Sequence, residues 1–281
     1  MFLKWGEGMR KLFTLVIATI TVLIVSILFG QLLGGFYIYN LLVGDNLSLE
    51  HKEVKLQATP MEKRKVLRLE PIDFYTIQVG IYPEVKSAQS SIDKLVNLGL
   101  RPFVSSEPPF KIWVGCFGEI SLGKELENAL KQQGFDAFRG KGLINDRALK
   151  FPSNNIFMKE KFAPLLGKYD LVLRHSIKMF RSPKISEYSL DLWENMITKV
   201  QSEISEAVTY LDNLKEMEES KDYHRELLNL KEKAISYGQS LNLILKSKSD
   251  EAVLYSQGHL LELIAAYHNL ITNTNEKLGT N

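Results

Sequence analysis

Cysteines, clustered histidines and a large net charge are all missing from this chain of 281 residues. Its single cysteine, Cys116, excludes an intrachain disulfide and a multi-cysteine metal cluster. Its five histidines are scattered and lack the spacing of a zinc site. The formal net charge of +2 creates no overall field that would attract nucleic acid. No nucleophile elbow, phosphate loop or His-Glu metal signature occurs, so the sequence predicts a non-enzymatic protein without cofactor or metal.

Charge is also absent from a long stretch near the N-terminus, between Lys11 and Asp45. A helix needs about 20 mainly apolar residues to cross a bilayer, so residues 12–40 are predicted to form a transmembrane helix. A buried core helix would be shorter and amphipathic, and a cleaved signal peptide would have a shorter apolar region and an A-x-A-like cleavage site. The cations before the span predict a cytoplasmic tail at residues 1–11 and an extracytoplasmic C-terminal bulk in a single-pass cell-membrane protein.

One sequence motif is present twice. The stretch from Ile77 to Tyr82 matches the stretch from Ile112 to Phe117, and three later pairs match at the same shift: Leu95 with Leu130, Gly99 with Gly134, and Phe103 with Phe138. Each copy has the pattern of a strand, a helix and a strand. Two such halves predict a βαββαβ ferredoxin-like domain at residues 72–142, with one sheet and two helices on one of its faces. The other face of the sheet is expected to be open.

Strand alternation assigns side chains to these two faces. The apolar positions Ile77, Val79, Ile81, Ile112, Val114 and Cys116 are expected to face the helices. The open face then carries the candidate binding residues, which are Thr76, Gln78, Tyr82, Lys111, Trp113 and Phe117. An exposed indole beside amide and ammonium groups is suited to stacking on a sugar ring and bonding its hydroxyls.

The rest of the chain divides into residues 41–71 before this domain and residues 150–281 after it. We interpret the first segment as a charged, solvated linker. The second carries three heptad-like apolar stripes with short breaks between them, from Trp193 to Leu214, from Tyr223 to Ile244 and from Val253 to Leu270. Such stripes are typical of coiled-coil packing or an antiparallel α-helical bundle. The stripes either close on one another or recruit a partner helix, and the presence of several favours the first. The whole chain is therefore predicted to be α+β.

The duplicated domain resembles a known family. The residues Tyr75-Thr-Ile-Gln-Val-Gly80, followed by Phe110-Lys-Ile-Trp-Val-Gly-Cys-Phe117, are similar to the SPOR (sporulation-related repeat) domain, and the resemblance covers about a quarter of the chain. It departs at Cys116, where the family often has proline or a small residue. The resemblance implies binding to peptidoglycan, in particular to glycan strands without stem peptides, which accumulate at division septa. It places contacts at Gln78, Lys111 and Trp113.

These observations lead to two functional expectations. The first is a membrane-anchored protein whose external domain binds peptidoglycan glycan and directs it to the septum in division or sporulation. The second is a membrane-anchored structural adaptor that binds a protein partner through its C-terminal helices. RNA-recognition domains share the βαββαβ order, but their basic-Gly-aromatic-Gly signature is absent and the expected compartment lacks RNA, so no nucleic-acid partner is expected.

Overall fold

The computed structural model describes residues 64–144, 147–181 and 184–278. All of these residues belong to one compact unit, Met61–Asn281. The predicted cytoplasmic tail, the predicted transmembrane helix and the linker up to residue 63 therefore lie outside the described residues. Within the described ranges, no helix combines the length and the apolar character needed to cross a membrane.

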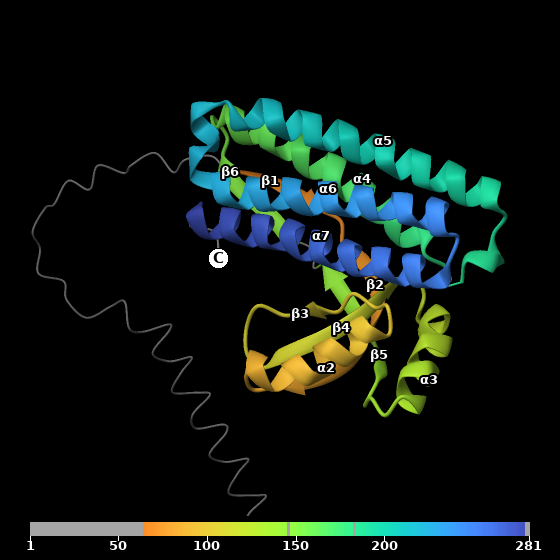
Figure 1. The fold of residues 1–281 in the computed structure, drawn as a ribbon. Helices are drawn as coiled ribbons and strands as arrows, with labels where there is room; N and C mark the ends of the chain where they lie inside the picture. Colours follow the sequence, from red (N-terminus) through yellow and green to blue (C-terminus); the bar gives the residue numbers. More distant parts are fainter. Residues whose placement is uncertain (1–63, 145–146, 182–183, 279–281) are drawn as a thin grey trace, which may run out of the picture. The chain divides into compact units, whose positions relative to one another are not determined.

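The duplicated sequence forms the expected βαββαβ order. Its elements are β2 (Ile72–Tyr82), α2 (Val85–Asn97), β3 (Phe103–Val104), β4 (Phe110–Phe117), the 3-10 turn η1 (Ile120–Gly123), α3 (Lys124–Gln132) and β5 (Phe138–Ile144). The strands lie in the order β3-β4-β2-β5 and every neighbouring pair is antiparallel. The matched first strands of the two copies, β2 and β4, are thus the central neighbours (Figure 1).

A second sheet was not predicted. It has two antiparallel strands, β1 (Arg64–Leu69) and β6 (Arg147–Pro152), with Leu67 opposite Leu149. Strand β1 lies inside the segment that was interpreted as a linker. The strand was missed because its basic side chains made the segment look solvated, although Leu67 and Leu69 alternate along it and pack on the core. Strand β6 overlaps the start of the region expected to be wholly helical.

The C-terminal region is helical as predicted. It contains the short π-helix η2 (Met158–Phe162), α4 (Ala163–Met179), the 3-10 helix η3 (Ile185–Glu187), α5 (Leu190–Lys215), the 3-10 helix η4 (Glu218–Tyr223), α6 (His224–Ser247) and α7 (Asp250–Lys277). Two serines begin helices as N-caps: Ser189 accepts from the Leu192 N–H and Ser249 from the Ala252 N–H. Only Lys248 and Ser249 separate α6 from α7, so α7 runs back along α6.

The predicted stripes face inward. On α5 the buried positions are Trp193, Ile197, Val200, Ile204, Ala207, Leu211 and Leu214, and each was a predicted stripe residue. The stripe that begins at Tyr223 and ends at Ile244 is buried along α6, as are the predicted positions of α7. Because these residues share one core cluster, the apolar stripes of the helices are buried against one another within the chain.

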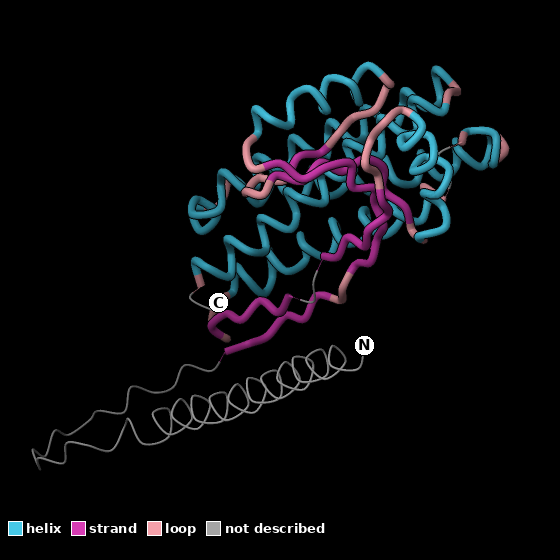
Figure 2. Tube along the Cα trace, turned by 90° about the horizontal axis from the view of Figure 1, so that it is seen from below, coloured by secondary structure: helices cyan, strands magenta, loops and turns pink. Residues whose placement is uncertain are grey.

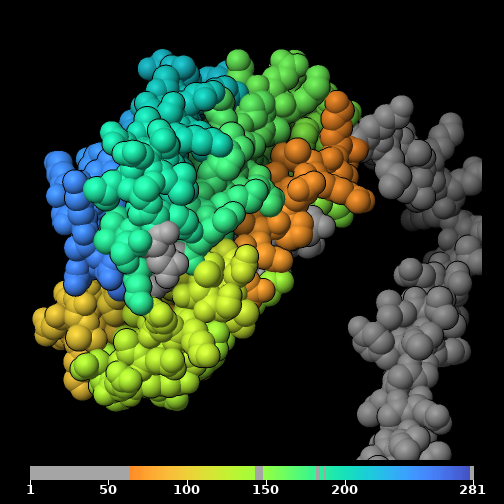
Figure 3. Space-filling view, turned by 90° about the vertical axis from the view of Figure 1, so that its right-hand side faces the viewer, coloured from red at the N-terminus to blue at the C-terminus, as the bar shows by residue number. Residues whose placement is uncertain are grey.

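That core extends into the sheet of the duplicated domain. Ile72 and Phe74 of β2 and Cys116 of β4 belong to the same cluster as the residues of α4–α7. The opposite face of the sheet has its own core with α2 and α3. The expected open face is therefore wrong, because α7 packs against β4 and β3 on that side. In Figure 2 the helices lie alongside the strands. In Figure 3 the atoms of the duplicated domain are in contact with those of the C-terminal helices.

Candidate functional site

A cleft of about 570 Å³ remains where α7 leaves part of the sheet uncovered. The sheet contributes four of the six candidate residues, namely Thr76, Gln78, Lys111 and Trp113. The loop after β3 contributes Ser105 and Ser106, and the helices contribute Asn229, Lys233, Glu262, His268 and Asn269. The structure therefore brings four of the predicted residues together on the sheet side of one cleft, whose helical side was not predicted.

The pairing of β2 with β4 positions the middle of the site. Gln78 lies opposite Trp113 in the register, and the Trp113 Nε1–H donates to Gln78 Oε1 over 3.4 Å. The Thr76 hydroxyl donates to the backbone carbonyl of Val114 at 3.2 Å. Gln78 is 8% exposed, so its amide is held at the base of the cleft.

The indole of Trp113 is only partly accessible. Its register partner on β3 is Phe103, and the two rings stack at a centroid distance of 5.7 Å with an interplanar angle of 8°. Phe103 therefore covers one side of the indole, and both rings also contact the helical core. The flat, freely exposed platform expected from alternation is replaced by an aromatic pair in the wall of a cleft.

Charged groups of both signs line the cleft. Glu262 of α7 accepts from Lys233 at 3.1 Å and forms a second ion pair with Arg101 at 2.7 Å. Lys141 pairs with Asp73 at 3.1 Å, and both side chains are about half exposed. Within the described residues, the Lys111 ammonium has no ion-pair partner, so it is the cation most available to an anionic ligand.

Tyr82 and Phe117 do not belong to the site, which corrects two of the six predicted positions. Phe117 is 1% exposed and lies in the core with α2 and α3. The Tyr82 hydroxyl is 2.6 Å from the Ser91 hydroxyl on α2, on that same side of the sheet. Conversely, Cys116 belongs to the helical core although alternation had assigned it to the other face.

Glycines cause these reversals. Gly115 has φ of +71°, and the register shifts between Tyr75 and Ile77 on the partner strand, which is the geometry of a glycine β-bulge. A second shift occurs between Gln78 and Gly80. Each bulge moves the next aromatic residue to the other face. A glycine inside a strand is a known sign of a bulge, so the Val-Gly-x-aromatic motif contained the necessary signal.

Two titratable groups near the sheet–helix contact are perturbed by burial. Burial lowers the pKa of His259 to about 4, and the Arg101 cation acts in the same direction. Burial raises the pKa of the Cys116 thiol, which is fully buried and therefore unsuited to nucleophilic or redox chemistry. Among the described residues no group of three or more His, Cys, Asp or Glu could hold a metal ion.

The helical residues of the cleft were missed for a physical reason. Lys233 and Glu262 occupy polar positions beside the apolar stripes, where charged side chains ordinarily face solvent. His268 of α7 also lines the cleft. No local pattern in α6 or α7 indicates that a distant sheet will approach these positions.

Comparison of the chain with known proteins gives no match to any family model, to any curated protein or to any solved structure.

Proposed function

We propose that this chain is a non-enzymatic, membrane-anchored protein that binds peptidoglycan glycan without stem peptides and is targeted to the septum in division or sporulation. The observation that carries the proposal is the convergence of Thr76, Gln78, Lys111 and Trp113 on one cleft. Three of these residues are the positions at which the resemblance to the SPOR domain places contacts. The anchor in this proposal is the apolar segment of residues 12–40.

The composition of the cleft suits a sugar chain. A pyranose ring has an apolar face and a rim of hydroxyl groups, and aromatic side chains beside amides and hydroxyls complement both. Phe103 and Trp113 supply apolar surface, while Gln78, Ser105 and Asn229 supply hydrogen-bonding groups along the same cleft. The walls formed by the sheet and α7 favour an unbranched strand, because a peptide branch on each second sugar would meet one of them.

Charge supports the preference for a strand without peptides. Removing a stem peptide from muramic acid frees a lactyl carboxylate, so such a strand carries repeated negative charges. Lys111 lines the cleft, and within the described residues its ammonium has no ion-pair partner. A charge-assisted hydrogen bond contributes about 1.5–3 kcal/mol, which is enough to distinguish the two kinds of strand.

The experiment is retention of the full-length chain on purified cell-wall sacculi, with and without prior removal of stem peptides by an amidase. Lys111→Gln is expected to weaken retention about tenfold or more on amidase-treated sacculi. Lys86→Gln is the matched control, because Lys86 is an exposed lysine on α2, on the other side of the sheet. Equal retention of the two variants, with equal unfolding midpoints, would refute the assigned cleft.

A second candidate is the adaptor function, in which the sheet mainly supports the helices. The observation that favours it is the shared core, since Ile72, Phe74 and Cys116 pack with residues of α4–α7. A test that deletes the helices would expose this apolar face and destabilise the domain. Septal placement is therefore compared between the full-length Lys111→Gln variant and the wild type. Normal placement of a variant that no longer binds sacculi would favour a protein partner.

A further inference from the structure

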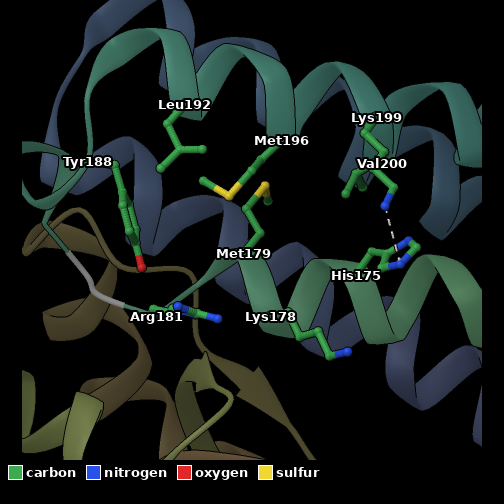
Figure 4. A pocket seen from close by; sticks show the side chains of 9 residues that line it. All are labelled: His175, Lys178, Met179, Arg181, Tyr188, Leu192, Met196, Lys199 and Val200. Atoms are coloured by element: carbon green, nitrogen blue, oxygen red, sulfur yellow. Dashed lines mark hydrogen bonds between the residues drawn. The ribbon is translucent and has the colours of Figure 1, made fainter.

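A second cavity lies in the helical region, between the end of α4 and the beginning of α5. Its volume is about 320 Å³, at the lower end of the range for small-ligand sites. It shares no lining residue with the cleft on the sheet. Figure 4 shows its side chains, which come from α4, from α5 and from the segment that joins them.

The inner wall of this cavity is apolar. Met179 of α4 is 2% exposed, and Met196 of α5 points toward it from the opposite helix (Figure 4). Leu192 lies at the edge and is 44% exposed, which is high for a leucine beside a core. Methionine side chains are flexible and polarizable, so this wall can adapt to an apolar group of variable shape.

The rim is cationic. Lys178, Arg181 and Lys199 line the cavity, and no carboxylate does so among the described residues. The nearby carboxylate of Glu203 is already engaged, because His175 Nδ1 lies 2.7 and 2.9 Å from its two oxygens. Over the described ranges neither Lys178 nor Arg181 has an ion-pair partner, so their charges are not balanced locally.

Helix stability does not explain this arrangement. Lys178 lies in the last turn of α4, where a cation favourably opposes the helix dipole. Arg181 lies beyond the end of that helix, and Lys199 lies within α5, where the dipole exerts little force. The arrangement instead suits an amphiphilic anion, because the three cations of the rim complement its charge and the apolar wall complements its apolar group.

We propose that this cavity binds a compact organic anion, a phosphate ester or carboxylate that carries an apolar group. Arg181 offers a planar fork of donors to the anionic oxygens, and the two lysines add point charges at the rim. The apolar group lies against Met179 and Met196. This site is independent of the glycan cleft. The same chemistry is found in a soluble metabolite and in the headgroup region of an anionic lipid.

The test uses the full-length chain in neutral detergent, with its methionine methyl groups labelled with carbon-13. Phenyl phosphate is the probe, phenyl β-glucoside tests the need for charge, and inorganic phosphate tests the need for the apolar group. Saturable shifts of the Met179 and Met196 signals are expected with phenyl phosphate, and at least tenfold weaker binding is expected for each comparator. Absence of a saturable shift, or equal binding of inorganic phosphate, overturns the proposal.

Substitutions locate the site. Arg181→Gln and Lys178→Gln are each expected to weaken phenyl phosphate binding about tenfold. Lys246→Gln is the matched control, because Lys246 is an exposed cation in the last turn of α6, as Lys178 is in α4. Its substitution removes the same dipole interaction and should leave binding unchanged. If Lys246→Gln binds phenyl phosphate as weakly as Arg181→Gln, at equal unfolding midpoints, the assignment of the site to this cavity is overturned.

A second arm separates the two sources of ligand. The labelled chain is placed in bilayer discs of phosphatidylcholine, with or without phosphatidylglycerol. Methyl shifts that require phosphatidylglycerol and disappear in Arg181→Gln support the site and identify a lipid headgroup. Shifts with phenyl phosphate but none with phosphatidylglycerol support it and identify a soluble anion.

Discussion

The contact between α7 and the sheet domain depends on the missing side chain of Gly258. A Cβ placed on Gly258 would lie 2.3 Å from the Arg101 carbonyl oxygen and 2.5 Å from the Arg101 Cβ. The first of these atoms belongs to the backbone and the second is attached to it, so no side-chain rotation relieves the clash. Gly258→Ala must therefore displace α7 from the sheet. Overpacking of this kind costs about 1–3 kcal/mol, and the better helix propensity of alanine offsets at most about 1 kcal/mol.

Two other helical glycines provide controls, because alanine at these positions is expected to raise the free energy of unfolding instead of lowering it. A Cβ on Gly167 of α4 would meet nothing within 4 Å, and one on Gly238 of α6 would lie 3.6 and 3.7 Å from Ile204 carbons, which is ordinary contact. Alanine at either position is expected to stabilise the protein by up to about 1 kcal/mol. The free energy of unfolding of each full-length variant is measured by denaturant titration followed by circular dichroism. A Gly258→Ala variant as stable as Gly167→Ala would refute the proposed close contact.

Three further predictions concern the same core. His259 has a pKa near 4 in the folded protein against its usual 6.5, so its stabilising effect is complete above pH 6.5 and is lost as the pH falls toward 4. His259→Gln should flatten the loss of unfolding free energy between pH 7 and 4.5, and an unchanged slope contradicts this. Cys116 should resist iodoacetamide until the protein unfolds, because it is fully buried, and labelling within minutes under native conditions would show otherwise. Gly115→Ala should lower the thermal midpoint more than Gly134→Ala, since both glycines have positive φ but only Gly115 lies under an aromatic ring; equal shifts would oppose this.

Local periodicity predicted the helices because their packing follows from it. The stripe from Trp193 to Leu214 repeats at intervals that place every member on one side of a helix, and each of these residues is buried. The sheet order was predictable for a related reason. Two copies of a strand-helix-strand unit have few ways to form one antiparallel sheet, and the duplication itself was visible in the sequence.

The face of the sheet on which each candidate residue lies was predictable for the part of each central strand that precedes its glycine. Thr76 and Gln78 precede Gly80, and Lys111 and Trp113 precede Gly115, so simple alternation holds for all four and they line one cleft. Tyr82 and Phe117 follow the glycines, and alternation fails for both after the bulge. The error is the same in both copies because the cause is duplicated with the motif.

Long-range contacts could not be derived in the same way. The pairing of β1 with β6 joins segments that lie far apart in the sequence, and neither strand has a strong pattern of its own. The approach of α7 to the sheet leaves one local trace, which is Gly258, and a single glycine in a helix does not by itself indicate a close contact. The helical half of the cleft depends on this approach and was therefore outside the reach of pattern analysis.

The position of α7 links stability to function in the proposed glycan site. Glu262 forms ion pairs with Arg101 of the sheet domain and Lys233 of α6, and Lys233 and Glu262 also line the cleft. The cleft therefore keeps its width only while α7 stays against the sheet. Gly258→Ala leaves every cleft side chain unchanged but shifts the helix that carries one wall. Loss of glycan binding in that variant would reflect the geometry of the cleft, whereas loss in Lys111→Gln would reflect its chemistry.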